Sequence, residues 1–185
     1  MAFTAVYDAC ALYPCTLRDV LIRVALGGLV QAKWTDQILD EAFDNLKENR
    51  PDLDPDNLDR TRDLMSRSVR DVLVTGYEPL IGILELPDPD DRHVLAAAIR
   101  SKAEVIVTSN LTDFPADRLE PWNVQAVHPD DFVLAQIDLD SHLVSEILQD
   151  IAKSWKNPGA TVQDVIASLE SNGLPKSATA LRALL

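Results

Sequence analysis

The chain has 185 residues, of which 46% are apolar, and it carries a formal net charge of −13. This length fits one domain with a small appendage, and the apolar fraction is enough for a hydrophobic core. The charge argues against a protein that coats nucleic acid through a broad basic surface, the apolar runs are too short to cross a bilayer, and the first residues lack the basic region of a signal peptide. A cytoplasmic location with no membrane contact follows by default.

The first half of the chain predicts one strand followed by helices. Phe3 to Tyr7 is a short apolar run typical of a buried strand, with Asp8 at its carboxyl end and a turn-like segment after it. Apolar residues at helical spacing predict a helix from Leu17 to Leu29, which stops near Gly27 and Gly28.

Two more helices are predicted before the middle of the chain. Thr35 starts the first of them, and Glu41 lies at the edge of its apolar face. A charged loop from Lys47 to Asp56 separates it from a helix over Leu58 to Val69. The short apolar runs Val72 to Val74 and Ile81 to Leu84 follow, and we expect at least one of them to be a strand.

A central helix begins at Pro89, a residue suited to the first helical position. Asp88 can cap its free backbone N–H groups. Asp91 shares a helix face with the apolar residues at positions 94, 95 and 98, so it is a carboxylate on a core-facing stripe. Asp90 lies to one side of that stripe, and Arg92 and His93 are expected to turn away from it.

The rest of the chain predicts two strands and a helical tail. Val105 to Thr108 is a buried strand, and Val124 to Val127 is a last short strand closed by His128 and Pro129. Strands that alternate with helices indicate an α/β fold of three α/β/α layers around a parallel sheet. We place the domain at residues 1–136 and a helical extension at 137–185.

Three helices are predicted in this extension. The first carries an apolar stripe through Leu143 and Ile151, and a break at Asn157, Pro158 and Gly159 ends it. Thr161 caps the second helix, and Ser177 starts the third after a break at 173–175.

Acidic and amide side chains stand where such a fold binds ligands. The expected ends of two strands carry Asp8, Asn110 and Asp113, and the carboxyl edge of an open parallel sheet is where ligands bind. Glu41 and Asp91 come from helices near that edge. Carboxylates gathered without basic neighbours repel one another, and a hard divalent cation such as Mg²⁺ relieves that repulsion. A cation there could polarise a phosphoryl oxygen and generate hydroxide, which is the chemistry of phosphodiester hydrolysis.

The order of these residues resembles the PIN-domain family, and within it the VapC-like toxins. The resemblance runs from about Phe3 to Phe132. It rests on Val6-Tyr7-Asp8, the helix with Glu41, Asp91-Arg92-His93-Val94-Leu95-Ala96-Ala97-Ala98, and Thr108-Ser109-Asn110-Leu111-Thr112-Asp113-Phe114. The last two motifs at this spacing are the specific ones.

The resemblance implies a metal-dependent ribonuclease, the toxin of a type II toxin–antitoxin pair. Asp8, Glu41, Asp91 and Asp113 would hold one or two Mg²⁺ or Mn²⁺ ions, and Asn110 would support a ligand or a water. The implied partners are an RNA substrate, an antitoxin protein and a second copy of the chain. One departure matters, because Ala9 and Cys10 stand where the family has a hydroxyl residue and then Asn.

Several alternatives stay open at this stage. A non-catalytic PIN-like binding module would keep the fold, although it would have no reason to keep several repelling acids. A receiver or phosphatase domain would want a lysine after a late strand, and Val127-His128-Pro129 offers none. Arg18, Lys33 and Arg92 are candidates for contacts with the RNA backbone, although a solvated surface role is the commoner one for such residues. The two cysteines, at positions 10 and 15, lack partners for a metal site and are expected to be buried and reduced.

Overall fold

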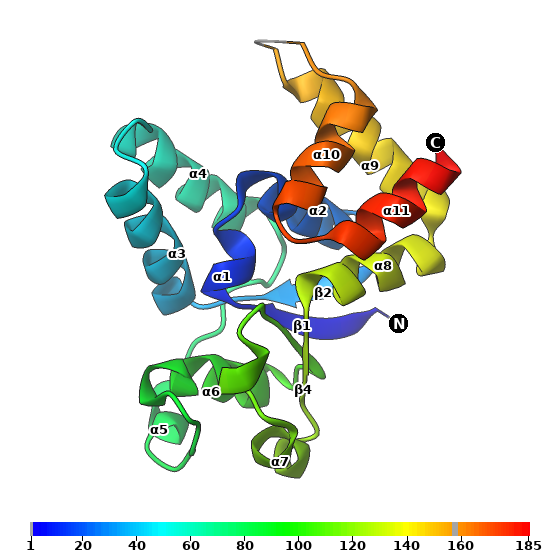
Figure 1. Ribbon diagram of the computed structural model, residues 1–185. Coiled ribbons are helices and arrows are strands. Elements are labelled where there is room, and N and C mark those ends of the chain that lie inside the picture. The colour runs from blue at the N-terminus through cyan, green and yellow to red at the C-terminus, as the bar shows by residue number, and fades with distance from the viewer. Residues whose placement is uncertain (1, 157–158) are drawn as a thin grey trace.

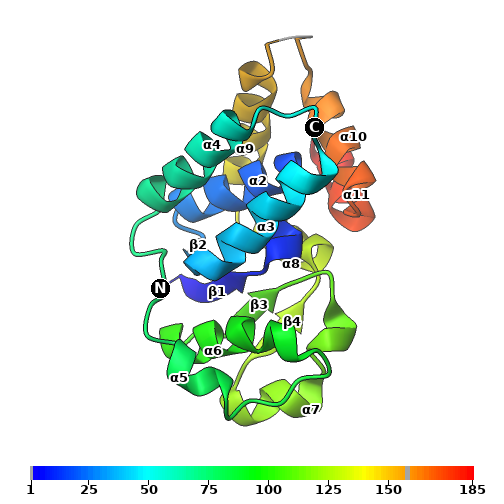
Figure 2. The same cartoon turned by 90° about the vertical axis from the view of Figure 1, so that its left-hand side faces the viewer.

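The computed structural model describes residues 2–156 and 159–185 and shows one parallel sheet between helices. The strand order is β2-β1-β3-β4, and every neighbouring pair is parallel. The strands are β1 (Phe3–Tyr7), β2 (Val30–Lys33), β3 (Val105–Val107) and β4 (Gln125–Val127). Figure 2 shows α2 (Cys15–Leu26), α3 (Asp36–Asn49) and α4 (Pro55–Ser68) on one side of the sheet, and α5 (Glu78–Ile81), α6 (Arg92–Ser101) and α7 (Ala116–Leu119) on the other. The three-layer α/β fold is therefore confirmed.

Local sequence explains where the helices begin. Thr35 caps α3 by accepting the Ile38 N–H at 3.0 Å, and Asp88 caps the short 3₁₀ turn Pro89–Asp91 that leads into α6. Further 3₁₀ turns span Leu111–Asp113 and Glu120–Trp122. The central strands β1 and β3 are buried because helices cover both faces of the sheet, as a parallel sheet requires.

The middle of the chain departs from the prediction. Neither Val72–Val74 nor Ile81–Leu84 forms a strand, since Leu73 makes only an isolated bridge to Trp34, and α5 ends at Ile81. Instead β2 is the missing strand of the sheet, directly before Trp34. Gly76 and Pro79 lie between the two apolar runs, and the short helix α5 takes up the start of the second run.

The segment after β4 contains a helix that was not predicted. Strand β4 ends at Val127, before His128 and Pro129, as predicted, and these two residues start helix α8 (Pro129–Leu139), with His128 accepting the Asp130 N–H. The predicted boundary between residues 136 and 137 falls inside this helix. Phe132 of α8 packs edge-on against Phe3 and Tyr7 of β1, with ring centroids 6.0 and 5.8 Å apart.

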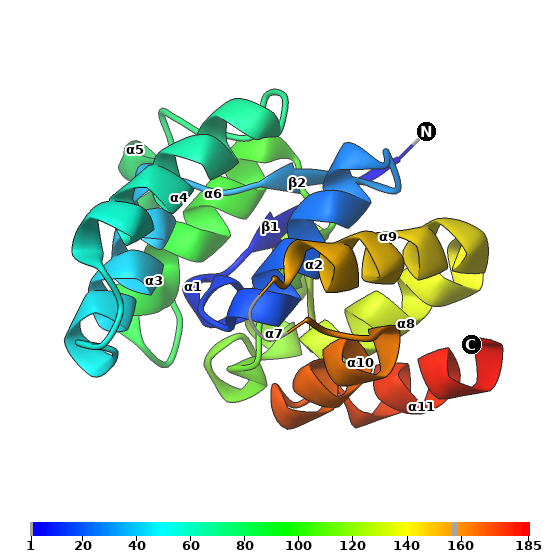
Figure 3. The same cartoon turned by 90° about the horizontal axis from the view of Figure 1, so that it is seen from above.

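The extension continues as three helices that pack on the same side of the molecule (Figures 1 and 3). They are α9 (Ser141–Ser154), α10 (Val162–Ser171) and α11 (Pro175–Leu184). A hydrogen bond of 2.7 Å between the hydroxyls of Thr16 and Ser168 joins α2 to α10. Thr161 caps α10 as predicted, and α11 begins at Pro175, two residues before the predicted Ser177. The predicted break at Asn157 and Pro158 lies outside the described residues.

No helix in the described part of the chain combines the length and the apolar content that crossing a membrane requires. Both cysteines are free, as predicted, but only Cys10 is partly buried, and Cys15 is exposed at the start of α2. The prediction of a buried Cys15 was therefore wrong, because the helix face it occupies points away from the core.

Helix α11 lacks a cap of its own and takes one from α8. The buried Asp130 carboxylate accepts the Ser177 N–H at 2.8 Å and the Lys176 N–H at 2.9 Å, and the Ser177 hydroxyl donates to the Asp130 carbonyl. Burial alone would raise the pKa of Asp130, but these amide hydrogen bonds outweigh it and lower the pKa below its usual value. Asp130 therefore anchors the last helix.

Replacing Asp130 by Ala is expected to lower the free energy of unfolding by about 2 kcal/mol, because two amides lose their buried acceptor. Denaturant unfolding at pH 7 measures the loss. Asp131→Ala is the matched control, since Asp131 is exposed and its ion pair with Lys176 is in water. A folded pKa below the unfolded one gives stability that is present at neutral pH and lost as pH falls below about 4. The difference between Asp130→Ala and the parent should therefore shrink in acid, and a difference that grew there would contradict the anchoring role.

Candidate active site

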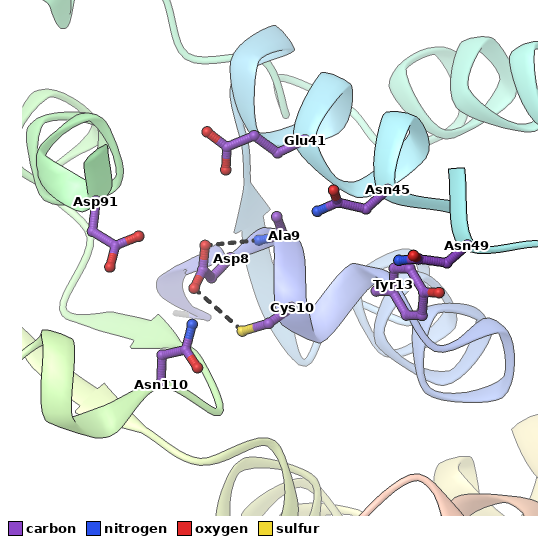
Figure 4. A pocket seen from close by; sticks show the side chains of 9 residues that line it. All are labelled: Asp8, Ala9, Cys10, Tyr13, Glu41, Asn45, Asn49, Asp91 and Asn110. Atoms are coloured by element: carbon purple, nitrogen blue, oxygen red, sulfur yellow. Dashed lines mark hydrogen bonds between the residues drawn. The ribbon is translucent and has the colours of Figure 1, made fainter. Parts of the chain in front are cut away.

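A cavity of about 320 Å³ opens at the carboxyl ends of β1 and β3 (Figure 4). Side chains from four parts of the chain line it, namely the β1–α1 junction, α3, the turn before α6 and the loop after β3. The lining residues are Asp8, Ala9, Cys10, Tyr13, Glu41, Asn45, Asn49, Asp91 and Asn110. Four of the five acids and amides predicted from the sequence, Asp8, Glu41, Asp91 and Asn110, therefore meet in one cleft.

Asp8 is the fixed member of the group. It lies at the end of β1, is 4% exposed, and caps the short helix α1 (Ala9–Leu12). One carboxylate oxygen accepts the Ala9 N–H and the other accepts the Thr108 hydroxyl, each at 2.8 Å. These two hydrogen bonds hold the carboxylate in one orientation and leave further lone pairs for a ligand.

The residues around Asp8 include Cys10, at the position where the sequence departs from the family pattern. The Thr108 hydroxyl, directly after β3, donates the side-chain hydrogen bond that orients Asp8. Cys10 Sγ lies 3.3 Å from Asp8 Oδ2, from the Thr108 hydroxyl oxygen and from the Ser109 nitrogen. Burial and the charge of Asp8 raise the pKa of Cys10, so the group beside Asp8 is a neutral thiol.

Asp91 faces Asp8 across the cleft (Figure 4). The pKa of Asp91 is raised to about 6. Burial is the largest cause, and the nearby charges of four acidic residues add to it, namely Asp8, Asp88, Asp113 and Glu41. Asp90 is exposed and lies outside the cleft lining. Of the two neighbouring acids, Asp91 therefore lines the cleft and Asp90 does not, and Asp88 caps the turn as predicted.

Glu41 enters the cleft from α3 and meets His93 of α6. His93 is 2% exposed, and its Nε2 lies 2.8 Å from Glu41 Oε1. The two atoms are close enough for an ion pair, but the ring is not oriented for a hydrogen bond between them. The expectation that His93 turns away from the core was therefore wrong. The buried face of α6 is wider than predicted, because the helix packs against β1 and β3 and His93 reaches Glu41 of α3. His93 links the helix that carries Glu41 to the helix that follows Asp91.

Asn110 and Asp113 take different places. Asn110 lines the cleft below Asp8, whereas Asp113 lies at the end of the Leu111–Asp113 turn and outside the lining. Asp113 is still close enough to Asp91 for its charge to raise the pKa of Asp91. The structure thus brings Asp113 to the rim of the acidic group.

The three basic candidates are not equivalent. Arg18 is 7% exposed and donates to the carbonyls of Leu12 and Tyr13, which does not favour a contact with RNA. Lys33 donates to the Asp71 carbonyl and lines a different cavity beside β2. Arg92 directly follows Asp91 and lines a neighbouring cavity together with Arg118. Only Arg92 therefore lies next to the acidic cleft.

Five lining residues were not among the predicted site residues: Ala9, Cys10, Tyr13, Asn45 and Asn49. A signal for two of them existed, because Asn45 and Asn49 stand four and eight residues after Glu41 and so share its helix face. Tyr13 gave no such signal, since its position depends on the short helix α1, which the sequence indicated only as a turn.

The lining carries the oxygen ligands that hard divalent cations prefer. The pKa of Asp91 is raised first by burial and then by its acidic neighbours, and a bound cation would relieve the repulsion between these acids. The carboxylates surround the cleft rather than meet at one point. Within residues 2–156 and 159–185, no three His, Cys, Asp or Glu side chains are close enough together to hold an ion. The donor set therefore fits a cation in its chemistry, and Glu41 and Asp91 would have to move toward Asp8 to bind it.

Comparison with known proteins gives two family matches. The model of the PIN domain matches residues 4–112, and that of the VapC50 C-terminal domain matches residues 129–183. Over 94 residues the chain is 42% identical to a protein of Mycobacterium tuberculosis named "Putative ribonuclease VapC50". The aligned part is 51% of this chain and 55% of that protein, so the chain spans about half the length of this relative. No solved structure matches the chain significantly.

Proposed function

This chain belongs to the PIN-domain family, and from that premise we propose that it is a divalent-cation-dependent endoribonuclease, the toxin of a type II toxin–antitoxin pair. The observation that carries the proposal is the cleft in which Asp8, Glu41, Asp91 and Asn110 meet at the carboxyl edge of the sheet. The name of the mycobacterial relative, "Putative ribonuclease VapC50", agrees with this proposal.

The residues of the cleft would have different roles in binding the cation and the RNA. Asp8 offers a carboxylate already fixed by Ala9 and Thr108, while Asp91 and Glu41 bring charge from the two flanking helices. Asn110 can donate its amide to a phosphate oxygen beside them. A bound Mg²⁺ or Mn²⁺ would polarise the phosphoryl oxygen and lower the pKa of a bound water. Acidic residues that otherwise repel one another are the arrangement that such an ion stabilises.

The remaining parts of the proposal concern partners. The substrate is RNA, and the protein that blocks the cleft is an antitoxin, which implies action in the cytoplasm. The net charge of −13 suits a basic protein partner. A homodimer is proposed from the family resemblance. A receiver or phosphatase function is not favoured, because no lysine is among the residues that line the cleft.

The test is cleavage of RNA by the purified full chain. We expect products from single-stranded or structured RNA in Mg²⁺ or Mn²⁺, and no products from the same RNA with the protein omitted. End-labelled RNA resolved on a denaturing gel gives both the activity and the cleavage sites. RNA that binds but stays intact in every divalent ion would favour the non-catalytic binding module instead.

A further inference from the structure

The cleft has a second end that the proposed chemistry does not use. Figure 4 shows Asp8, Asp91, Glu41 and Asn110 around one end, and Tyr13 and Asn49 together at the other, with Asn45 between them. Asn45 and Asn49 come from the face of α3 that also carries Glu41. Tyr13 follows α1 directly, across the cleft floor from α3.

The polar groups at this end are available to bind a ligand. Among the described residues, the amide groups of Asn45 and Asn49 and the hydroxyl of Tyr13 make no hydrogen bond to another protein group. Both asparagines are exposed, and Tyr13 is partly buried. An exposed helix face usually carries charged residues, whereas here two amides stand one turn apart beside an aromatic ring.

Tyr13 is held firmly in its place. Arg18 donates to the carbonyls of Leu12 and Tyr13 at 2.8 and 3.1 Å, and its guanidinium lies over the Phe43 ring, 5.3 Å from the ring centroid. Because Phe43 belongs to α3, the buried arginine ties the Tyr13 backbone to the helix that carries the two asparagines. This gives Arg18 a role different from the RNA contact expected from the sequence.

The lining groups indicate the kind of ligand that fits this end. The three carboxylates of the cleft lie at its other end, and the cations nearest Tyr13, Arg18 and Arg50, line a second cavity that shares Tyr13 with this one. The uncharged amides and the aromatic ring at this end favour a neutral, planar and polar group. Amide side chains match the hydrogen-bonding edges of nucleobases, and aromatic rings stack on their faces.

We propose that Tyr13, Asn45 and Asn49 form a nucleobase-binding subsite, which takes the base next to the phosphate held at the acidic end. Tyr13 stacks on the base, and the two amides read its edge and set the sequence preference of cleavage. The proposal rests on the proposed function in one respect, since it assumes that the nucleic acid lies along this cleft.

The test is equilibrium binding, which does not depend on cleavage. Fluorescein-labelled oligonucleotides of A, C, G or U are titrated with the full chain in a buffer with Ca²⁺, an oxygen-ligated cation that takes the place of Mg²⁺ at the carboxylates, and anisotropy gives each Kd. We expect Tyr13→Ala to raise Kd about tenfold for the preferred base. Tyr13→Phe keeps the ring and should restore most of the affinity. Asn45→Ala and Asn49→Ala should reduce the difference in Kd between the preferred base and the other three.

Gln163→Ala is the matched control, because it removes an exposed amide from α10 outside the cleft. Unchanged affinity and unchanged base preference in Tyr13→Ala and both asparagine variants would overturn the subsite. Base-selective binding that depends on Tyr13 without any RNA cleavage would support the subsite and refute the ribonuclease. RNA cleavage that shows no base preference, in binding or in the cleavage sites, would support the ribonuclease and refute the subsite.

Discussion

Asp91→Asn is expected to lower RNA cleavage by a factor on the order of 10²–10³, while the chain stays folded. The reason is that Asp91 faces Asp8 across the cleft and is one of the charges that a cation would need. Asparagine keeps the shape of the side chain and removes only the charge. Rates from end-labelled RNA, measured at saturating Mg²⁺, give the factor.

Asp90→Asn is the control for this substitution. It removes the same charge from the preceding residue, which is exposed and outside the cleft lining. We expect its cleavage rate to stay within about twofold of the parent, since an exposed charge at this distance is screened. Equal losses in the two variants would mean that general surface charge, not the cleft, governs the activity.

The same Asp91→Asn variant should be more stable than the parent when no divalent cation is present. The folded pKa of Asp91 is raised to about 6 from 3.8, so the charged carboxylate destabilises the folded state at neutral pH. This destabilisation is complete above about pH 6 and absent below about pH 4, where the parent binds a proton itself. The gain in melting temperature should therefore be a few degrees at pH 7 and vanish toward pH 4.

Divalent cations are the second large effect. Mg²⁺ that binds only the folded chain at 100 times its Kd stabilises it by about 2.7 kcal/mol, which corresponds to a rise in melting temperature of about 5–10 °C for a chain of this size. Excess EDTA should abolish cleavage, and added Mg²⁺ or Mn²⁺ should restore it. Thermal unfolding followed by circular dichroism measures the rise in melting temperature. The sample without Mg²⁺ contains NaCl at the same ionic strength.

Asp8→Asn separates specific binding of the cation from general screening. Asp8 is the fixed carboxylate of the cleft, so its loss should remove most of the rise in melting temperature caused by Mg²⁺. Cleavage that continues at full rate in EDTA would refute the role of the cation. A rise in melting temperature that is the same in Asp8→Asn would place the ion elsewhere on the acidic surface.

The sequence predicted the parts of the fold that carry strong local signals. The buried run of β1, the cap at Thr35 and the Asp88-Pro89 start of the central turn each combine pattern with capping chemistry. Strand β2 was missed because four residues next to two glycines give too short an alternation to distinguish from a helix end. Helix α8 was missed because His128-Pro129 fits both a strand end and a helix start.

The site was predicted where chemistry and position in the chain coincide, and missed where packing decides. Asp8 and Asn110 follow strands, so topology alone brings them to one edge. His93 and Arg18 are charged or polar residues whose burial depends on tertiary neighbours, Glu41 in one case and the Leu12 and Tyr13 carbonyls in the other. Local spacing does not contain that information.

Helix α8 has a consequence for how the molecule holds together. Its first turns place Phe132 against the rings of Phe3 and Tyr7, and Asp130 in the same helix caps α11. The first turn of one helix thus connects the sheet to the tail, so a change that loosens this turn affects both. Protein engineers who wish to trim the tail would have to redesign α8 first, because removing α11 would expose the side of α8 that packs against it.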